Sequence, residues 1–318
     1  MPSLRRVLAL ALLLATIAAG VALSTRGPEP APASAPPLGV RLTAEEKSVW
    51  RPLPVSRGGV PVLLYHGIGE RSESHDPADA AYAVRRPDFA KQMALLRAAG
   101  YQTITLEQFR RFHDGEPVEL PPHPLLLTFD DALTSSLDGA DSVLRELGWT
   151  AVMFVDVGAV DLGAPGYARW ERLTAAQSSK RWDLQLHAGR GHHNVAYDAA
   201  GTMGPFYAYR TGGESLDDWR GRVGEDIEWG EATLRAHVPG YRRLAFAPPY
   251  GNFGQLATND RRIPRQLGGW LRARFGLVFV QEPPRYARPA DAFIPRLQIT
   301  RKMAGGEIHA WLERELPR

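Results

Sequence analysis

Short apolar runs alternate with helix-like segments along this chain from about residue 58 onward. The runs contain few polar residues, as expected for strands that are buried on both faces. Strand–helix alternation of this kind indicates a parallel sheet covered by helices. Seven runs favour a distorted (β/α) barrel over an open sheet, and they lie at 60–65, 124–129, 150–155, 182–186, 244–247, 276–280 and 296–300. The predicted fold is therefore an α/β barrel of about seven parallel strands.

The first 57 residues differ in composition from the rest of the chain. Two arginines within residues 1–6 precede 17 apolar residues at 7–23, and a Pro/Ala-rich stretch follows. A basic head before an apolar stretch is typical of a secretory signal, and this stretch is also long enough for a membrane tether. We predict a signal peptide or signal anchor over 1–25, a spacer over 26–57 and a secreted or extracytoplasmic catalytic domain over 58–318.

Charge and cysteine content limit which partners and which catalytic or metal-binding groups this chain can have. The 318 residues include 38 Lys and Arg against 35 Asp and Glu, a net charge of +3 without a basic run, so no nucleic-acid partner is expected. Cysteine is absent, which excludes disulfides, thiolate zinc sites and cysteine nucleophiles. Any metal must therefore be held by histidine and carboxylate side chains. Nothing in the pattern requires a second subunit, and a monomer is expected.

Polar or turn-forming residues directly follow four of the predicted strands. His66 follows the first strand, Asp130 and Asp131 follow the second, and His187 and the Pro-Pro-Tyr-Gly turn at 248–251 follow two later ones. In parallel α/β barrels the carboxyl ends of the strands form one rim, where catalytic groups gather. We expect these residues to converge on one mouth of the barrel.

The aspartate pair and the nearby histidines favour a metal site. Asp130 and Asp131 are adjacent residues at the end of a strand, so their side chains point in different directions. One carboxylate can therefore bind a metal while the other faces the substrate. A helix N-cap is the alternative for this pair. His187 and His192 are five residues apart and can meet a metal through a turn, with His193 as an alternative second ligand. Together with Asp131 they suit a divalent metal, and zinc is favoured.

Three motifs occur in order: TFDDA at 128–132, the histidine pair at 187 and 192, and FAPPYG at 246–251. They resemble the motifs of the metal-dependent polysaccharide deacetylases, which share the NodB homology domain. VLLYH at 62–66 and RRPDFAKQMALL at 85–96 are most similar to the poly-β-1,6-N-acetylglucosamine N-deacetylase branch. The resemblance covers about residues 60–300 and implies a barrel of the NodB type.

The resemblance implies a role for each matched residue. Asp131, His187 and His192 would hold the metal, and Asp130 would be the general base that deprotonates the attacking water. The backbone N–H of Tyr250 would help to stabilise the oxyanion formed from an N-acetyl carbonyl.

The resemblance also bears on the general acid. Most members of the family have a histidine after a late strand, but Arg301 follows the strand at 296–300 here. In the poly-N-acetylglucosamine branch the equivalent strand lies at the start of the domain, where this chain has His66. His66 would therefore protonate the leaving sugar amine, and His309 is the alternative.

Two positions depart from the family pattern. Ala132 stands where glycine is usual, and Ala247 stands where most members have an arginine that pairs with the catalytic base. The poly-N-acetylglucosamine branch also tends to lack that arginine. Arg242 and Arg243 precede the strand, and we expect them to lie too far away to replace it.

The Gly-rich, aromatic segment 188–214 is too long for a simple connection and is a candidate binding loop. Aromatic rings suit the apolar faces of sugars, although Phe206, Tyr207 and Tyr209 could instead pack the loop onto the barrel. We predict Tyr207, Tyr209 and Pro249 as substrate-binding residues.

The resemblance as a whole implies a metal-dependent hydrolase that removes N-acetyl groups from an extracellular, poly-β-1,6-N-acetylglucosamine-like polysaccharide of a biofilm matrix. Peptidoglycan or chitin oligomers are the alternative substrates. A further alternative is a non-catalytic carbohydrate-binding protein with a degenerate site.

Overall fold

The computed structural model describes residues 39–50, 54, 58–70, 81–281 and 283–317. The expected signal or anchor segment at 1–25 and the first part of the expected spacer lie outside these residues. Within the described ranges, no helix has the length and hydropathy that crossing a bilayer requires.

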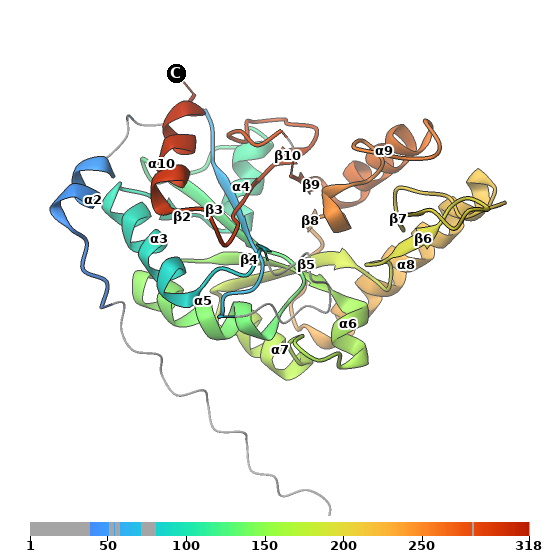
Figure 1. The fold of residues 1–318 in the computed structure, drawn as a ribbon, viewed down its shortest axis with the longest axis horizontal. Helices are drawn as coiled ribbons and strands as arrows, with labels where there is room; N and C mark the ends of the chain where they lie inside the picture. The colour runs from blue at the N-terminus through green and yellow to red at the C-terminus, as the bar shows by residue number, and fades with distance from the viewer. Residues whose placement is uncertain (1–38, 51–53, 55–57, 71–80, 282, 318) are drawn as a thin grey trace, which may run out of the picture. The chain divides into compact units, whose positions relative to one another are not determined.

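The main sheet is built from parallel strands in the order β10-β9-β8-β5-β4-β3-β1-β11, and β2 pairs with β3 outside this path (Figure 1). Every pairing within this sheet is parallel. The strands are β1 (Val62–Tyr65), β2 (Gln102–Thr103), β3 (Pro124–Phe129), β4 (Ala151–Asp156), β5 (Trp182–Ala188), β8 (Ala245–Phe246), β9 (Leu277–Val280), β10 (Ile294–Pro295) and β11 (Leu297–Gln298).

The two ends of this strand order are joined by a single residue. β10 pairs with β9 at one end and β11 pairs with β1 at the other, and Arg296 is the residue between β10 and β11. The segment 294–298 therefore nearly closes the sheet into a barrel, which confirms the predicted fold with its last strand split in two.

Apart from α2 before β1 and α10 after β11, the helices lie in the connections between strands, as parallel topology requires. The helices are α2 (Ala44–Val49), α3 (Arg86–Ala98), α4 (Leu106–His113), α5 (Thr134–Leu147), α6 (Val157–Leu162), α7 (Trp170–Ser178), α8 (Leu216–His237), α9 (Ile263–Phe275) and α10 (Gly305–Arg314), with a 3-10 turn, η2 (Pro249–Gly251). α3 contacts α5 on one side and α10 on the other, and it also contacts α2 (Figure 1). The antiparallel hairpin of β6 (Asn194–Ala196) and β7 (Met203–Pro205) extends the loop before α8.

Part of the expected spacer is folded. α2 begins with a capping box between Thr43 and Glu46, and Trp50 after it is 2% exposed in the main core. The packed body therefore starts earlier than residue 58.

Two apolar cores lie on opposite faces of the sheet, because side chains alternate along each strand. The inner core contains Val62 of β1, Leu126 of β3 and Phe154 of β4, and α4 closes one end of it with Phe109. The outer core joins the alternate strand residues to the surrounding helices. Asp130 has the same parity as Leu126, so its side chain is directed to the interior of the barrel at the other end.

Candidate active site

Asp131, His187 and His192 come together at the carboxyl ends of β3 and β5. The Nε2 atoms of both histidines lie 3.5 Å from Oδ1 of Asp131, and the two imidazole centroids are 5.0 Å apart. One nitrogen or oxygen atom from each residue lies within 4.8 Å of the others. His193, the alternative ligand, is exposed and lies outside this group, with its Nδ1 donating to the Arg190 carbonyl at 3.0 Å.

The ring of His187 is oriented by the strand beside it. β5 pairs with β8 so that Leu186 lies opposite Phe246, which places His187 level with Ala247. Nδ1 of His187 donates to the Ala247 carbonyl at 2.6 Å, so its other nitrogen faces Asp131 with a free lone pair. Burial lowers the pKa of His187 to about 3, which keeps the ring neutral at physiological pH.

The spacing of these three side chains fits a divalent metal. Ligand atoms bound to one tetrahedral zinc at about 2.0–2.2 Å lie about 3.3–3.6 Å from each other. The two separations of 3.5 Å in the structure fall in that range. Three protein ligands leave a coordination position for substrate or water, as catalytic sites require.

Buried negative charge around this site also favours a cation. Asp131, Asp156 and Asp226 are each at most 9% exposed, and the charges of Asp131 and Asp226 both act on Asp156. Burial raises the pKa of Asp156 to about 6, although nearby His192 opposes this shift. Oδ2 of Asp156 lies 3.8 Å from Nδ1 of His192, on the side of the ring away from Asp131. Asp156 ends β4 and also caps α6 through the Ala159 N–H, and no sequence motif pointed to it.

Asp130 forms a fully buried ion pair with Arg296. Nη1 and Nη2 of Arg296 donate to the two carboxylate oxygens at 2.7 and 2.8 Å, and the residues are 0% and 1% exposed. Burial would raise the pKa of Asp130, but the guanidinium and nearby His187 lower it below its usual value. The carboxylate is therefore ionised at neutral pH.

Arg296 provides Asp130 with an arginine partner, which Ala247 cannot provide from the motif position. It enters the barrel where the sheet closes, and its guanidinium lies 5.4 Å from the centroid of the Phe154 ring in the inner core. Arg242 and Arg243, which were expected to be too far away, pair instead with Glu107 and Glu231. A lone arginine in the apolar run at 293–299 was the available signal for this residue, but the sequence did not indicate its partner.

The turn after β3 is held in an unusual backbone conformation. Asp131 and Ala132 have φ angles of 75° and 63°, in the left-handed region that favours glycine. This geometry directs Asp130 and Asp131 to different sides of the turn, and it explains why a glycine suits position 132.

His66 lies beside Asp130 on the neighbouring strand. Tyr65 of β1 is in register with Phe129 of β3, so His66 and Asp130 leave the sheet at the same level. The charge of His66 contributes to lowering the pKa of Asp130. The imidazole stacks on Tyr82 with centroids 5.3 Å apart, and its buried Nδ1 has no hydrogen-bond partner among the described residues.

Comparison with known proteins identifies the family of one region of this chain. Residues 118–268 match the sequence profile of the polysaccharide deacetylase family. Residues 118–268 are therefore part of a polysaccharide deacetylase domain.

Two curated relatives of this chain come from Escherichia coli, strains O157:H7 and K12. Both are named poly-beta-1,6-N-acetyl-D-glucosamine N-deacetylase and are 26% identical to it over 238 residues. The matched region is 68% of this chain and 34% of each relative, so the chain spans about a third of their length.

Solved structures of deacetylases share the fold. IcaB from Ammonifex degensii has a TM-score of 0.61 and 26% identity, covering 81% of this chain and 98% of that one. A de-N-acetylase from Aggregatibacter actinomycetemcomitans has a TM-score of 0.67 and 17% identity, with 80% and 99% coverage. The BpsB deacetylase domain from Bordetella bronchiseptica has a TM-score of 0.60 and 22% identity, with 77% and 97% coverage.

The η2 turn lies beside His192, one of the three candidate metal ligands. Tyr250 has a φ of 59°, is 39% exposed, and stacks on His192 with centroids 5.1 Å apart. Pro249, expected to bind substrate, is buried in the turn. Tyr250 is therefore the residue of this turn that presents a ring to solvent at the mouth.

The two tyrosines expected to contact substrate differ in exposure. Tyr207 is 1% exposed, and its hydroxyl donates to Asp226. Tyr209 is partly exposed and stacks on Tyr197 of the hairpin loop at 4.7 Å between centroids. The buried position of Tyr207 keeps its ring away from a soluble ligand and makes it part of the loop packing.

The alternative acid, His309, lies elsewhere. It is 6% exposed on α10, with its ring 5.0 Å from that of Trp50 in the outer core. α10 contacts α3 on the outside of the barrel, away from the mouth.

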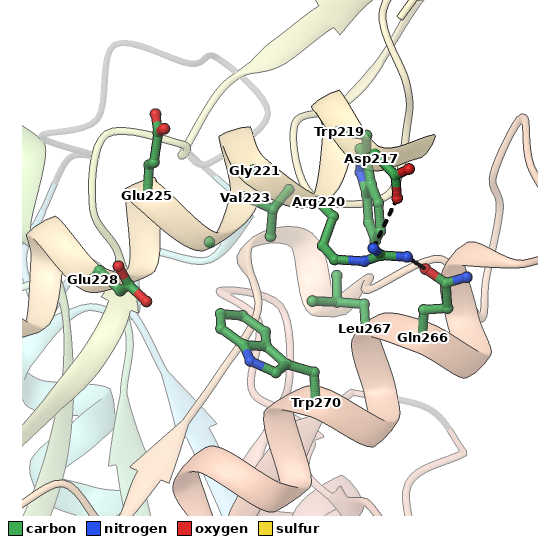
Figure 2. A pocket seen from close by; sticks show the side chains of 11 residues that line it. Asp217, Trp219, Arg220, Gly221, Val223, Glu225, Glu228, Gln266, Leu267 and Trp270 are labelled. Atoms are coloured by element: carbon green, nitrogen blue, oxygen red, sulfur yellow. Dashed lines mark hydrogen bonds and ion pairs between the residues drawn. The ribbon is translucent and has the colours of Figure 1, made fainter. Parts of the chain in front are cut away.

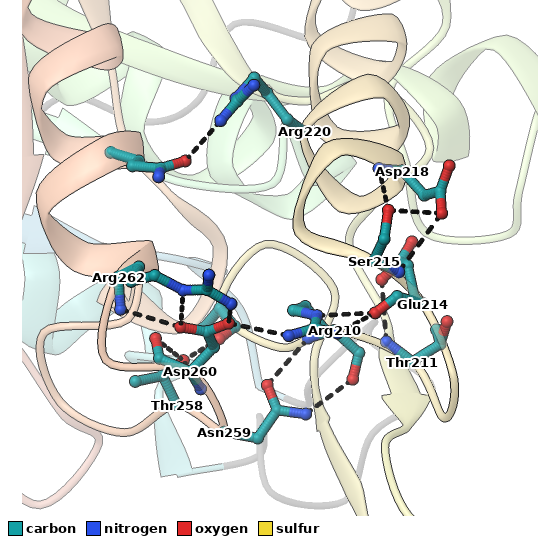
Figure 3. A network of polar contacts seen from close by, with 12 residues as sticks. Arg210, Thr211, Glu214, Ser215, Asp218, Arg220, Thr258, Asn259, Asp260 and Arg262 are labelled. Carbon is teal, nitrogen blue, oxygen red and sulfur yellow. Dashed lines mark hydrogen bonds and ion pairs between the residues drawn. The ribbon is translucent and has the colours of Figure 1, made fainter.

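Polar contacts join two loop segments of this chain (Figure 3). The side chain of Asn259 exchanges hydrogen bonds with the backbone of Arg210 at 3.0 and 2.8 Å, and Arg210 pairs with Asp260 at 2.9 Å. Hydrogen bonds from Arg262 lower the pKa of Asp260. The segment after the hairpin is therefore held against the segment after η2.

A groove of about 690 Å³ lies between α8 and α9 (Figure 2). Val223, Leu267 and Trp270 contribute apolar surface to this groove. Its lining includes neither Asp130 nor any of the candidate metal ligands, Asp131, His187 and His192. The catalytic candidates therefore lie at the barrel mouth and not in this groove.

Proposed function

We propose that this chain is a metal-dependent N-deacetylase that acts on N-acetylglucosamine units of an exported, poly-β-1,6-N-acetylglucosamine-like polysaccharide. The observation that carries the proposal is the grouping of Asp131, His187 and His192 beside the buried Asp130–Arg296 pair. The named relatives support the substrate class.

The proposed metal is zinc, held by Asp131, His187 and His192. Neutral imidazole and carboxylate ligands suit zinc, and other divalent ions accept the same donors. When bound, such an ion supplies Lewis-acid activation of water and of an acyl oxygen.

The remaining steps fall to residues of the chain itself. Asp130, kept ionised by Arg296, accepts a proton from the water that attacks the N-acetyl carbonyl. His66 donates a proton to the departing sugar amine, which is a poor leaving group unless protonated. The backbone N–H of Tyr250 donates to the developing oxyanion.

The proposed setting is extracytoplasmic, with residues 7–23 as a secretory signal or membrane tether. Removing acetyl groups leaves cationic amines on the polymer, which would help a biofilm matrix adhere to anionic surfaces. The enzyme is proposed to act as a monomer.

Acetate release from β-1,6-linked N-acetylglucosamine oligomers tests this function. The full chain is assayed after chelation, with and without added Zn²⁺, beside Asp130→Asn and the control Asp183→Asn. Asp183 is a half-buried aspartate that lies at the other end of β5 and accepts a hydrogen bond from Gln185.

We expect release that depends on metal, is lost in Asp130→Asn and persists in Asp183→Asn. Release only from chitin or peptidoglycan oligomers would replace the proposed substrate and keep the chemistry. Zinc binding without release from any acetylated glycan would instead indicate a carbohydrate-binding protein.

A further inference from the structure

The loop between the two candidate histidine ligands is held by one carboxylate on α8. Asp226 accepts hydrogen bonds from the backbone N–H groups of Gly189 at 3.0 Å and Arg190 at 2.5 Å. The hydroxyl of Tyr207 donates to the same carboxylate. Three donors from two segments therefore meet on Asp226.

α8 holds this loop at a second point. The guanidinium of Arg190 lies over the ring of Trp229, 3.8 Å from its centroid. Asp226 and Trp229 are three residues apart on α8 and therefore share a face of the helix. From the opposite side, the N–H of Gly158 donates to the Gly189 carbonyl at 2.6 Å.

The glycines of the loop show how closely it is packed. A Cβ at Gly189 would lie 2.1 Å from the Asp226 carbonyl oxygen, and a Cβ at Gly191 would lie 2.6 Å from the Phe206 ring. Because the backbone of the loop packs directly against α8, we expect a change at Asp226 to shift the loop. His192 is the next residue after Gly191 and would move with it.

The hydrogen bonds to Asp226 explain why this position carries a carboxylate. The side chain is 9% exposed, and none of the described arginines or lysines pairs with it. A buried carboxylate without a cation is costly, and an amide of the same shape would avoid that cost. An amide, however, would direct its own NH₂ group at one of the three donors, whereas a carboxylate accepts from all of them.

We propose that Asp226 is a positioning residue for the metal site: it fixes the loop 188–191 so that His192 reaches His187 and Asp131. The proposal rests on the metal binding in the proposed function. It also gives Tyr207 a role, because its hydroxyl completes the set of donors around the carboxylate.

The test compares Asp226→Asn with Glu231→Gln in the metal-free full-length protein. Glu231 is also a buried carboxylate on α8, at 2% exposed, but it pairs with Arg274 of α9 and not with the loop. The Zn²⁺ dissociation constant is measured by competition with a chromophoric chelator. Amide hydrogen exchange at residues 189 and 190 is measured without metal.

We expect Asp226→Asn to weaken zinc binding about 10–100-fold, the range found when a partner that orients a ligand is removed. Exchange at residues 189 and 190 should accelerate in the same variant. Glu231→Gln should leave the affinity within about threefold of the parent, whatever its effect on the melting temperature.

Tyr207→Phe provides a milder second variant, because it removes one donor and retains the ring. It should weaken zinc binding in the same direction without loss of the fold. If both Asp226→Asn and Tyr207→Phe bound zinc as the parent does, the positioning role would be wrong while the deacetylase proposal stood. A parent chain that bound no divalent metal would contradict the proposed function itself.

Discussion

Arg296 and Asp130 are 166 residues apart in sequence, yet both oxygens of the Asp130 carboxylate receive hydrogen bonds from one guanidinium. The pair forms because closure of the barrel brings the residue between β10 and β11 next to the end of β3. A buried pair of this geometry both orients the carboxylate and holds it ionised.

Arg296→Lys should lower kcat/KM by at least about tenfold, and by no more than the ~10²–10⁴-fold contribution of general base catalysis, since lysine cannot hold both carboxylate oxygens. The acidic limb of the pH–rate profile should move to higher pH, because Asp130 would lose part of the interaction that lowers its pKa. Arg274→Lys, which alters the partly buried pair of Arg274 with Glu231 outside the site, is the control. An unchanged acidic limb in Arg296→Lys would contradict the role of this arginine.

His66→Gln should reduce acetate release from an N-acetylated glycan about 10²–10⁴-fold, because the amine leaves only when protonated. With 4-nitrophenyl acetate the loss should be much smaller, because nitrophenolate leaves without a proton. Asp130→Asn should impair both substrates, since its proton comes from the attacking water. Equal losses on both substrates in His66→Gln would argue against an acid role.

The metal-free protein should lose stability as the pH falls from about 6.5 towards 3. Unfolded His187 takes up a proton near its ordinary pKa, whereas the folded residue resists protonation until about 3. The unfolded state therefore binds more protons over this window and is favoured by acid. Urea unfolding at about pH 7 and about pH 4.5 measures the loss, and His187→Asn should reduce it. Parallel pH dependence in the two proteins would refute this assignment.

Ala132→Gly should change the free energy of unfolding by less than about 1 kcal/mol. Relief of the left-handed backbone gains about 1–2 kcal/mol, while added chain entropy and the lost buried methyl oppose it by about 0.4–1 and about 0.8 kcal/mol. Ala140→Gly is the matched control, because Ala140 is equally buried but lies within α5. It should cost about 2 kcal/mol from helix propensity and the lost methyl. Chemical denaturation of both variants measures the difference, and equal costs would mean that position 132 carries no backbone strain.

The sequence by itself determined the barrel fold and placed the candidate catalytic residues at the carboxyl ends of its strands. Strand alternation has a period of two residues and is visible locally, and parallel strands place all their carboxyl ends at one rim. For this reason Asp130, Asp131, His187 and His66 could be assigned to one mouth from strand ends alone. The spacing of His187 and His192 fitted a turn, but it left His193 open as a ligand.

Tertiary structure decided which partners these residues have. Arg296 reaches Asp130 only because the sheet closes, and Asp226 reaches the metal-ligand loop only because α8 packs against it. It also decided that Tyr207 is buried, since an aromatic residue in an irregular loop has no period that reveals which way it faces. Contacts of this kind join segments far apart in the chain, and their free energy depends on how the whole barrel closes and packs.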